Sequence, residues 1–107
     1  MKIISSDLLR GHMDTFILGA LMKDKMNPSA VRRFIEEKTN GIYRPNEQTV
    51  YAAFHRLEDG GCVKGEWGEG ESQRKFYSIT EKGAEVYRYN AAEWETAKRL
   101  IDILIKD

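Results

Sequence analysis

Residues 46–61, NEQTVYAAFHRLEDGG, constrain the fold more than any other stretch of the chain. Their apolar side chains recur at i, i+3, i+4 and i+7, the period of a helix with one buried face: Val50, Ala53, Phe54 and Leu57. Asn46 can cap the free backbone N–H groups of a helix start, and Gly60 and Gly61 end the pattern. The stretch therefore predicts an amphipathic helix over 46–59, around which the rest of the chain is organised.

The opposite face of this helix is unusual for a solvated surface. It combines small residues, an aromatic ring and hydrogen-bond donors: Gln48, Thr49, Tyr51, Ala52, His55 and Arg56. Side chains of these types contact base edges and phosphates in protein–DNA complexes. We interpret the stretch as the recognition helix of a DNA-binding domain.

Position along the helix suggests a role for each side chain. The N-terminal half of such a helix usually enters the major groove deepest, so Gln48 and Thr49 are expected at or near base edges. Tyr51 is expected at a base or a phosphate. His55 and Arg56 lie further along and are expected to hold the DNA backbone.

Two of these assignments have structural alternatives. Tyr51 would pack against the preceding helix if it belonged to the core instead of the interface. Arg56 would form an ion pair with Glu58 or Glu37, because surface ion pairs are common.

Two helices are predicted before this stretch. The first covers 7–22, where apolar residues keep a helical period: Leu9, Met13, Phe16, Ile17, Ala20 and Leu21. The second covers 28–39, because Pro28 is tolerated at the first helical position. Asn40 and Gly41 accept the left-handed backbone angles that stop a helix.

The period of the pattern changes after residue 61. Residues 62–67 and 74–79 are typical of short strands, and the glycine-rich segment 68–73 joins them into a hairpin. Thr80 then caps a long helix that continues to about residue 105. This order of elements predicts an α+β, mostly α, winged helix-turn-helix with a long C-terminal dimerisation helix.

The basic end of the hairpin is expected to face DNA. Glu69 and Glu71 at its tip would be repelled by phosphate, so we place the contact at the residues that follow: Ser72, Gln73, Arg74 and Lys75. The alternative is that Arg74 and Lys75 form only a solvated strand end.

Composition limits the class of protein. The 107 residues suit one compact domain, which we divide into a winged part over 1–79 and a dimerisation helix over 80–107. The 17 basic and 17 acidic side chains leave no formal net charge, so a DNA contact requires a local basic patch. No stretch approaches the roughly 20 apolar residues of a membrane span, which favours a cytoplasmic protein without a membrane partner.

Catalytic and metal-binding signals are weak. Cys62 is the single cysteine, which excludes an internal disulfide and a cysteine-cluster zinc site. His12 and His55 lack the spacing of a ligand pair. The glycine-rich segment carries acidic residues where a bound phosphate would lie. We therefore expect no metal, no cofactor and no enzyme activity.

The final helix carries an apolar seam. Its members follow a seven-residue spacing: Tyr87, Trp94 and Ile101, with Asn90, Ala97 and Leu104 three residues after each. A coiled-coil-like seam implies a partner helix. We expect a homodimer whose two-fold axis places two recognition helices roughly 34 Å apart, which matches a palindromic operator on double-stranded DNA.

The motifs together resemble the PadR family of bacterial transcriptional regulators. The residues that carry the resemblance are EQTVY at 47–51, RLE at 56–58 with Gly61, SQRK at 72–75 and YSITEKG at 77–83. The likeness covers about residues 8–104, and the single terminal helix is similar to the smaller subfamily, which includes a lactococcal multidrug-responsive repressor. Two departures are MNPSAV at 26–31, where members often carry a Tyr-Gly-Tyr type sequence, and a shorter, more acidic wing tip.

The resemblance implies a repressor that a small molecule relieves. In the lactococcal relative, the tryptophan that matches Trp94 lines a drug-binding pore at the dimer centre. By this likeness, residues around a planar aromatic effector would be Leu8, His12, Thr15, Asn90, Trp94, Lys98 and Ile101. The alternative for Trp94 is that it fills the dimer core. The alternative for the whole chain is a winged-helix protein-interaction module without operator binding.

Overall fold

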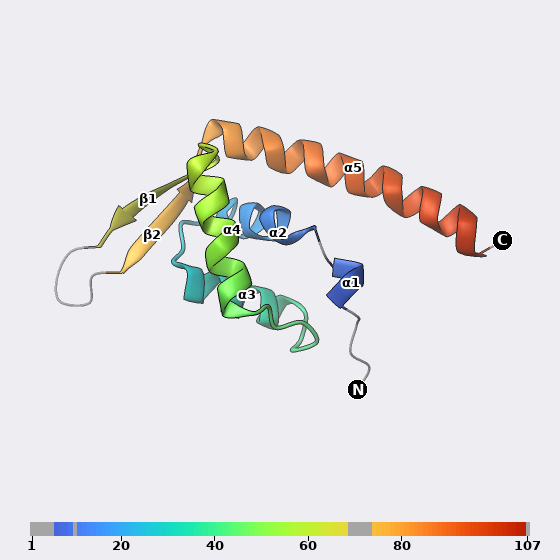
Figure 1. The fold of residues 1–107 in the computed structure, drawn as a ribbon, viewed down its shortest axis with the longest axis horizontal. Coiled ribbons are helices and arrows are strands. Elements are labelled where there is room, and N and C mark those ends of the chain that lie inside the picture. The colour runs from blue at the N-terminus through green and yellow to red at the C-terminus, as the bar shows by residue number, and fades with distance from the viewer. Residues whose placement is uncertain (1–5, 10, 69–73, 107) are drawn as a thin grey trace.

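Three of the five helices in the described residues and a hairpin surround one core, and the long last helix lies across them (Figure 1). The computed structural model describes residues 6–9, 11–68 and 74–106. Its elements, in chain order, are α1 (Ser6–Leu9), α2 (Met13–Leu21), α3 (Pro28–Lys38), α4 (Glu47–Asp59), β1 (Val63–Trp67), β2 (Lys75–Ile79) and α5 (Glu81–Lys106). The fold class expected from the sequence, mostly helical with one small antiparallel sheet, is confirmed.

The predicted single helix over 7–22 is wrong, because the chain forms α1 and α2 separately. Gly11 has a φ of 88°, a left-handed backbone angle that glycine adopts without the penalty of a Cβ. The amide of His12 donates to the carbonyl oxygen of Leu9 at 3.2 Å, which closes the turn. The apolar period continues across this break, so it did not reveal the break.

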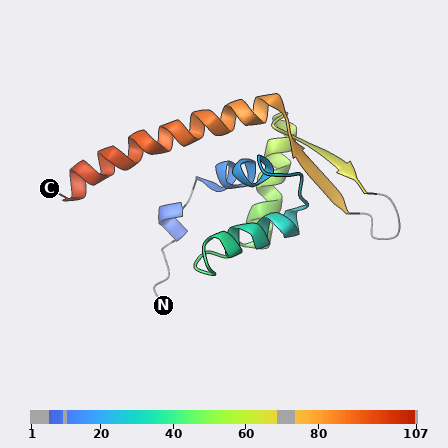
Figure 2. The same ribbon diagram turned by 180° about the vertical axis from the view of Figure 1, so that it is seen from behind.

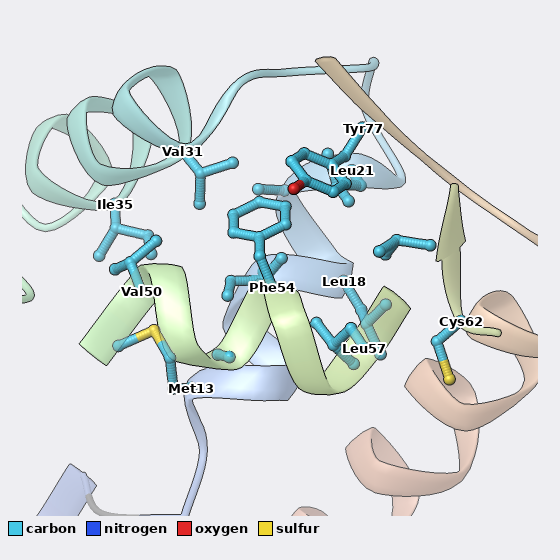
Figure 3. Close-up of a cluster of buried hydrophobic side chains, with 14 residues drawn as sticks. Met13, Leu18, Leu21, Val31, Ile35, Val50, Phe54, Leu57, Cys62 and Tyr77 are labelled. Atoms are coloured by element: carbon cyan, nitrogen blue, oxygen red, sulfur yellow. The ribbon is translucent and has the colours of Figure 1, made fainter. Parts of the chain in front are cut away.

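The core forms where α2, α3 and α4 meet (Figure 3). Phe54 of α4 is 1% exposed, and its ring centroid lies 4.5 Å from that of Tyr77 in β2. The predicted apolar stripe of α4 is buried throughout, at Val50, Ala53, Phe54 and Leu57. The burial of this stripe confirms the amphipathic helix that the sequence predicts.

Helices α3 and α4 each begin at an asparagine that caps the helix. The side chain of Asn27 accepts a hydrogen bond from the amide of Ala30 at 2.7 Å. The side chain of Asn46 accepts from the amides of Gln48 and Thr49 at 2.8 and 3.2 Å. These acceptors satisfy donors that a helix start leaves free, and the cap predicted at Asn46 is confirmed.

The hairpin is anchored to the core at its base. β1 and β2 pair antiparallel, from Val63 opposite Ile79 to Trp67 opposite Lys75. Met26, between α2 and α3, exchanges two backbone hydrogen bonds with Tyr77, at 3.1 and 2.9 Å. The hairpin therefore projects from a base that is bonded to the helical part (Figure 1).

The long helix α5 starts in close contact with the chain beneath it. The amide of Gly83 donates to Oγ1 of Thr80 at 3.1 Å, which confirms Thr80 as a cap. A Cβ on Gly83 would overlap the carbonyl oxygen of Cys62. Only glycine allows this approach, which fixes the start of α5 against the connection between α4 and β1.

The first half of α5 then runs antiparallel along α2 in its own chain. A Cβ on Gly19 would lie 3.0 Å from Cε1 of Tyr87, and Nδ2 of Asn90 donates to Oγ1 of Thr15 at 3.0 Å. The second half of α5 extends past α2 and α3 (Figure 2). Its apolar side chains are exposed there, from 47% at Ile101 to 79% at Leu104.

Candidate nucleic-acid interface and cavity

The outward face of α4 is free of contacts that would bury it. The side chains predicted to contact DNA are all exposed: Gln48, Thr49, Tyr51, Ala52, His55 and Arg56. Tyr51 is 41% exposed, so the alternative in which it packs into the core against α3 is wrong. The face is shaped by the local sequence, because the buried stripe on the other side of α4 fixes which residues point outward.

Arg56 is held by an ion pair whose acid the sequence did not indicate. Its guanidinium nitrogen lies 2.7 Å from Oδ1 of Asp14 in α2, and both side chains are partly exposed. The alternative expected from the sequence, a pair with Glu58 or Glu37, named the wrong acids. Asp14 is 42 residues away in the chain, so only the packing of α2 against α4 brings the two together.

The hairpin residues that were predicted to face DNA differ in their surroundings. Ser72 and Gln73 lie outside the described residues. Arg74 is exposed, as a phosphate contact requires. Lys75 is only partly exposed, and its ammonium group donates to Oε1 of Glu58 in α4 at 3.1 Å. This hydrogen bond raises the pKa of Lys75 above its ordinary value.

Polar contacts also hold α3 and the segment that leads to α4. Nε of Arg32 donates to the carbonyl oxygen of Pro45 at 3.1 Å. Nε of Arg44 donates to Oε2 of Glu36 at 2.8 Å, and this partner raises the pKa of Arg44. Burial raises the pKa of the neighbouring Tyr43. These contacts hold the segment that connects α3 to α4, and so help to orient the exposed face of α4.

A cavity of about 620 Å³ lies between α2, α3 and the first half of α5. Five of the residues assigned to an effector by family likeness line it: Leu8, His12, Thr15, Asn90 and Trp94. Its aromatic walls also include residues that were not assigned to an effector: Phe16, Phe34 and Tyr87. The sequence pattern indicated a buried helix face for Phe16 and a dimer seam for Tyr87, not proximity to a cavity.

Lys98 and Ile101, the other two residues of that assignment, do not line this cavity of the single chain. Successive α5 residues meet α2 in reverse order. Tyr87 meets Gly19, Asn90 meets Thr15, and the ring of Trp94 lies edge-on to that of His12 with centroids 5.3 Å apart. The helix α2 starts at residue 13, so no further turn of α2 lies opposite the α5 residues beyond Trp94.

Trp94 is 44% exposed within one chain. Its ring therefore borders both the cavity and the surface of the molecule. The apolar seam beyond it, at Ile101 and Leu104, is exposed as a dimer interface requires. Tyr87 and Asn90, which were also assigned to this interface, contact α2 of the same chain.

The part of the chain that the structure describes contains no group of three or more His, Cys, Asp or Glu side chains that could hold a metal ion. Among the same residues, no helix combines the length and the hydropathy needed to cross a membrane. The geometry thus leaves two candidate sites, the exposed face of α4 with the hairpin and the cavity beside Trp94.

Comparison with known proteins adds independent evidence. A model of the transcriptional regulator PadR-like family matches residues 17–89. The structure is similar to that of a transcriptional regulator from Clostridium thermocellum, with a TM-score of 0.91 and 38% sequence identity over 96% of this chain and 99% of that chain.

Two further solved structures are similar. One is a PadR family transcriptional regulator from Eggerthella lenta, with a TM-score of 0.84 and 26% identity over 94% of this chain and 87% of that chain. The other is Bacillus subtilis PadR in complex with operator DNA, with a TM-score of 0.65 and 18% identity over 75% of this chain and 46% of that chain. At that identity the second likeness shows the fold alone.

Proposed function

This chain belongs to the PadR-like family of transcriptional regulators, and we propose that it is a dimeric repressor that binds a palindromic operator through α4 and the hairpin. The observation that carries the proposal is the exposed face of α4, with Gln48 and Thr49 beside its capped start. A helix of this kind fits the major groove, where donors and acceptors distinguish the bases. Bacillus subtilis PadR, which shares the fold, is found in complex with operator DNA, and this supports DNA binding by a chain of this fold.

The chemistry of the face assigns different tasks to its residues. Gln48 and Thr49 read bases, since amide and hydroxyl groups hydrogen-bond to base edges. Arg74, exposed at the end of the hairpin, neutralises a phosphate. Because the whole chain has no formal net charge, this local contact replaces a general basic surface.

The first prediction separates base reading from phosphate contact. With Gln48 and Thr49 both replaced by alanine, we expect affinity for the operator to fall at least about 30-fold, with little change on random DNA, because each of the two base contacts contributes about 1–3 kcal/mol of discrimination. Replacing Arg74 by alanine should weaken binding to both DNAs and lower the salt slope by about 1. The measurement is titration of the labelled DNA upstream of the gene at several salt concentrations.

Thr96→Ala is the matched control, because Thr96 is an exposed threonine on α5. It should leave both affinities unchanged. If the upstream fragment is not selected, the same titration is repeated with fragments from the whole genome. Absence of any selected, salt-sensitive site would favour the alternative, a winged-helix protein-interaction module.

Dimerisation is the second part of the proposal. Ile101 and Leu104 leave apolar surface exposed on the second half of α5, and a second copy related by a two-fold axis would cover it. Such an axis would present two α4 helices to successive major grooves, roughly 34 Å apart. An operator with two-fold symmetry follows from this arrangement.

Relief by a planar aromatic molecule is the third part, and the cavity beside Trp94 supports it. Aromatic side chains from α2, α3 and α5 surround the space, and flat rings stack well on such walls. Lys23 and Lys38 at the cavity outnumber Glu95, which favours a neutral or anionic ring system. To act as an inducer, the molecule must prefer the arrangement that does not bind DNA, with a coupling of typically about 1–3 kcal/mol.

The second prediction tests this cavity. Replacing Trp94 by alanine should weaken binding of 8-anilinonaphthalene-1-sulfonate, an anionic aromatic dye, about tenfold, because one stacking wall is lost. The measurement is dye fluorescence during titration with protein. Trp67→Ala is the control, since Trp67 is 68% exposed on the hairpin and should not affect the dye. Equal affinities for wild type and Trp94→Ala would place the dye outside the cavity.

A further inference from the structure

The side chain of Lys75 turns back toward α4 and away from solvent. Its Nζ lies 3.1 Å from Oε1 of Glu58, and the two side chains are 28% and 32% exposed. The same ammonium group lies 5.3 Å from the ring centroid of Tyr77 and 5.9 Å from that of Trp67. Lys75 thus has a carboxylate and two aromatic faces as neighbours, which is a specific setting for a cation.

Gly65 leaves room for the side chain of Lys75 to reach Glu58. It lies opposite Tyr77 in β1, while Lys75 lies opposite Trp67, so Lys75 must cross the neighbouring strand to reach α4. A Cβ on Gly65 would overlap Cε of Lys75 and would lie 3.0 Å from Oε2 of Glu58. The glycine therefore provides the gap through which the lysine stem passes.

The position of this ion pair determines how it restrains the hairpin relative to α4. The hairpin is attached to the helical part at Tyr77, in the middle of β2, which bonds to Met26. Lys75 is the first residue of β2, on the side of Tyr77 away from α5, and Glu58 lies near the end of α4. The pair is a polar attachment of the hairpin to α4, in addition to the contact of Tyr77 with Phe54, and each added attachment opposes rotation of the hairpin.

We propose that Glu58 and Lys75 are positioning residues, which hold the hairpin at the angle to α4 that DNA reading requires. This inference rests on the proposed function. It also reassigns Lys75, which the sequence analysis had placed on DNA: the lysine acts through Glu58 and does not contact phosphate. The competing role, in which Lys75 leaves Glu58 to bind phosphate, requires the opposite response to removal of the Glu58 charge.

The test compares variants of the full chain in the operator titration. Glu58→Gln and Lys75→Met should each lower operator affinity about three- to tenfold, and the double variant should lose no more than either alone, because residues of one pair are not additive. The slope of log affinity against log salt should stay unchanged, since no phosphate contact is lost. Exchanging the charges, with Glu58→Lys and Lys75→Glu together, should restore most of the affinity.

Glu66→Gln is the matched control, because Glu66 is an exposed acid on the same hairpin and should leave operator affinity unchanged. The proposal is overturned if Glu58→Gln raises affinity while Lys75→Met lowers the salt slope by about 1, as a phosphate contact would. It is equally overturned if neither variant changes affinity, or if the charge exchange restores nothing.

A second measurement needs no DNA and keeps the two proposals separate. Trp67 neighbours Lys75, so its fluorescence anisotropy decay, recorded with Trp94→Phe present, reports the motion of the hairpin. Glu58→Gln should increase that motion, and Glu66→Gln should not. If the wild type selects no DNA, the proposed function fails. An unchanged motion of the hairpin in Glu58→Gln would overturn the role of the Glu58–Lys75 pair, whether or not the chain selects DNA.

Discussion

Replacing Phe54 by alanine is expected to lower the free energy of unfolding by about 3–5 kcal/mol. Phe54 is 1% exposed at the centre of the core (Figure 3). Its ring contacts Tyr77 of the hairpin, so the side chain joins α4 to β2 as well as to α2 and α3. Truncation would leave a cavity that the capped helices cannot close without losing their own contacts. The measurement is chemical denaturation followed by circular dichroism.

Tyr51→Ala is the matched control for this loss. Tyr51 is an aromatic residue of the same helix, but it is 41% exposed, so its removal should cost less than about 1 kcal/mol. If Phe54→Ala does not fold, Phe54→Leu, which keeps most of the volume, should fold with a smaller loss. Equal losses for Phe54→Ala and Tyr51→Ala would contradict the assignment of the core.

The second large effect is expected at the exposed seam of α5. Replacing Ile101 and Leu104 together by lysine should convert the dimer to a monomer, because four like charges would meet across the two-fold axis. Operator affinity should then fall about 100- to 10,000-fold, since each half-site would lose the effective concentration supplied by its neighbour. Sedimentation equilibrium measures the first effect and operator titration measures the second.

A shifted pair of substitutions gives a sharp control. Leu100 and Ile103 have the same spacing one residue earlier and are also exposed. Because successive helical residues are rotated by about 100°, lysines there would point away from the predicted seam. The shifted variant should remain a dimer. A monomer in both variants, or in neither, would show that another surface joins the copies.

Helix α4 could be predicted from the sequence because the residues that determine it are close together in the chain. Asn46 and the apolar residues of α4 lie within a few turns of one another, and a helical period relates them directly. Gly11 shows the limit of this reasoning. The apolar period runs through it, and only its φ of 88° reveals that the chain turns there.

The ion-pair partners of Arg56 and Lys75 could not be predicted from the sequence in this way. The partner of Arg56 is Asp14, which lies on another helix, and the partner of Lys75 depends on the hairpin register that places Gly65 in its path. The exposed side of an element can be predicted from its own period. Which acid lies beside a cation there depends on how separate elements pack.

The residues that line the cavity could be predicted only in part, because they too come from separate elements. Trp94 and Asn90 were found through the α5 pattern and the family likeness, whereas the likeness also named Lys98 and Ile101, which do not line the cavity. The lining residues of α5 extend to Glu95, and α2, which they face, begins at residue 13, just after the turn at Gly11.

The helix α2 connects the two candidate sites, because it packs against the buried face of α4 and also lines the cavity. Ile17 and Leu18 are fully buried in the core under α4, while Thr15 and Gly19 border the cavity. Under the proposed function, an effector that displaces α2 and a DNA duplex held by α4 bias the same helix. Thermodynamic linkage then makes the coupling reciprocal: the factor by which an effector weakens operator binding equals the factor by which the operator weakens effector binding. Sensitivity to the effector would thus depend on how many operator copies are occupied.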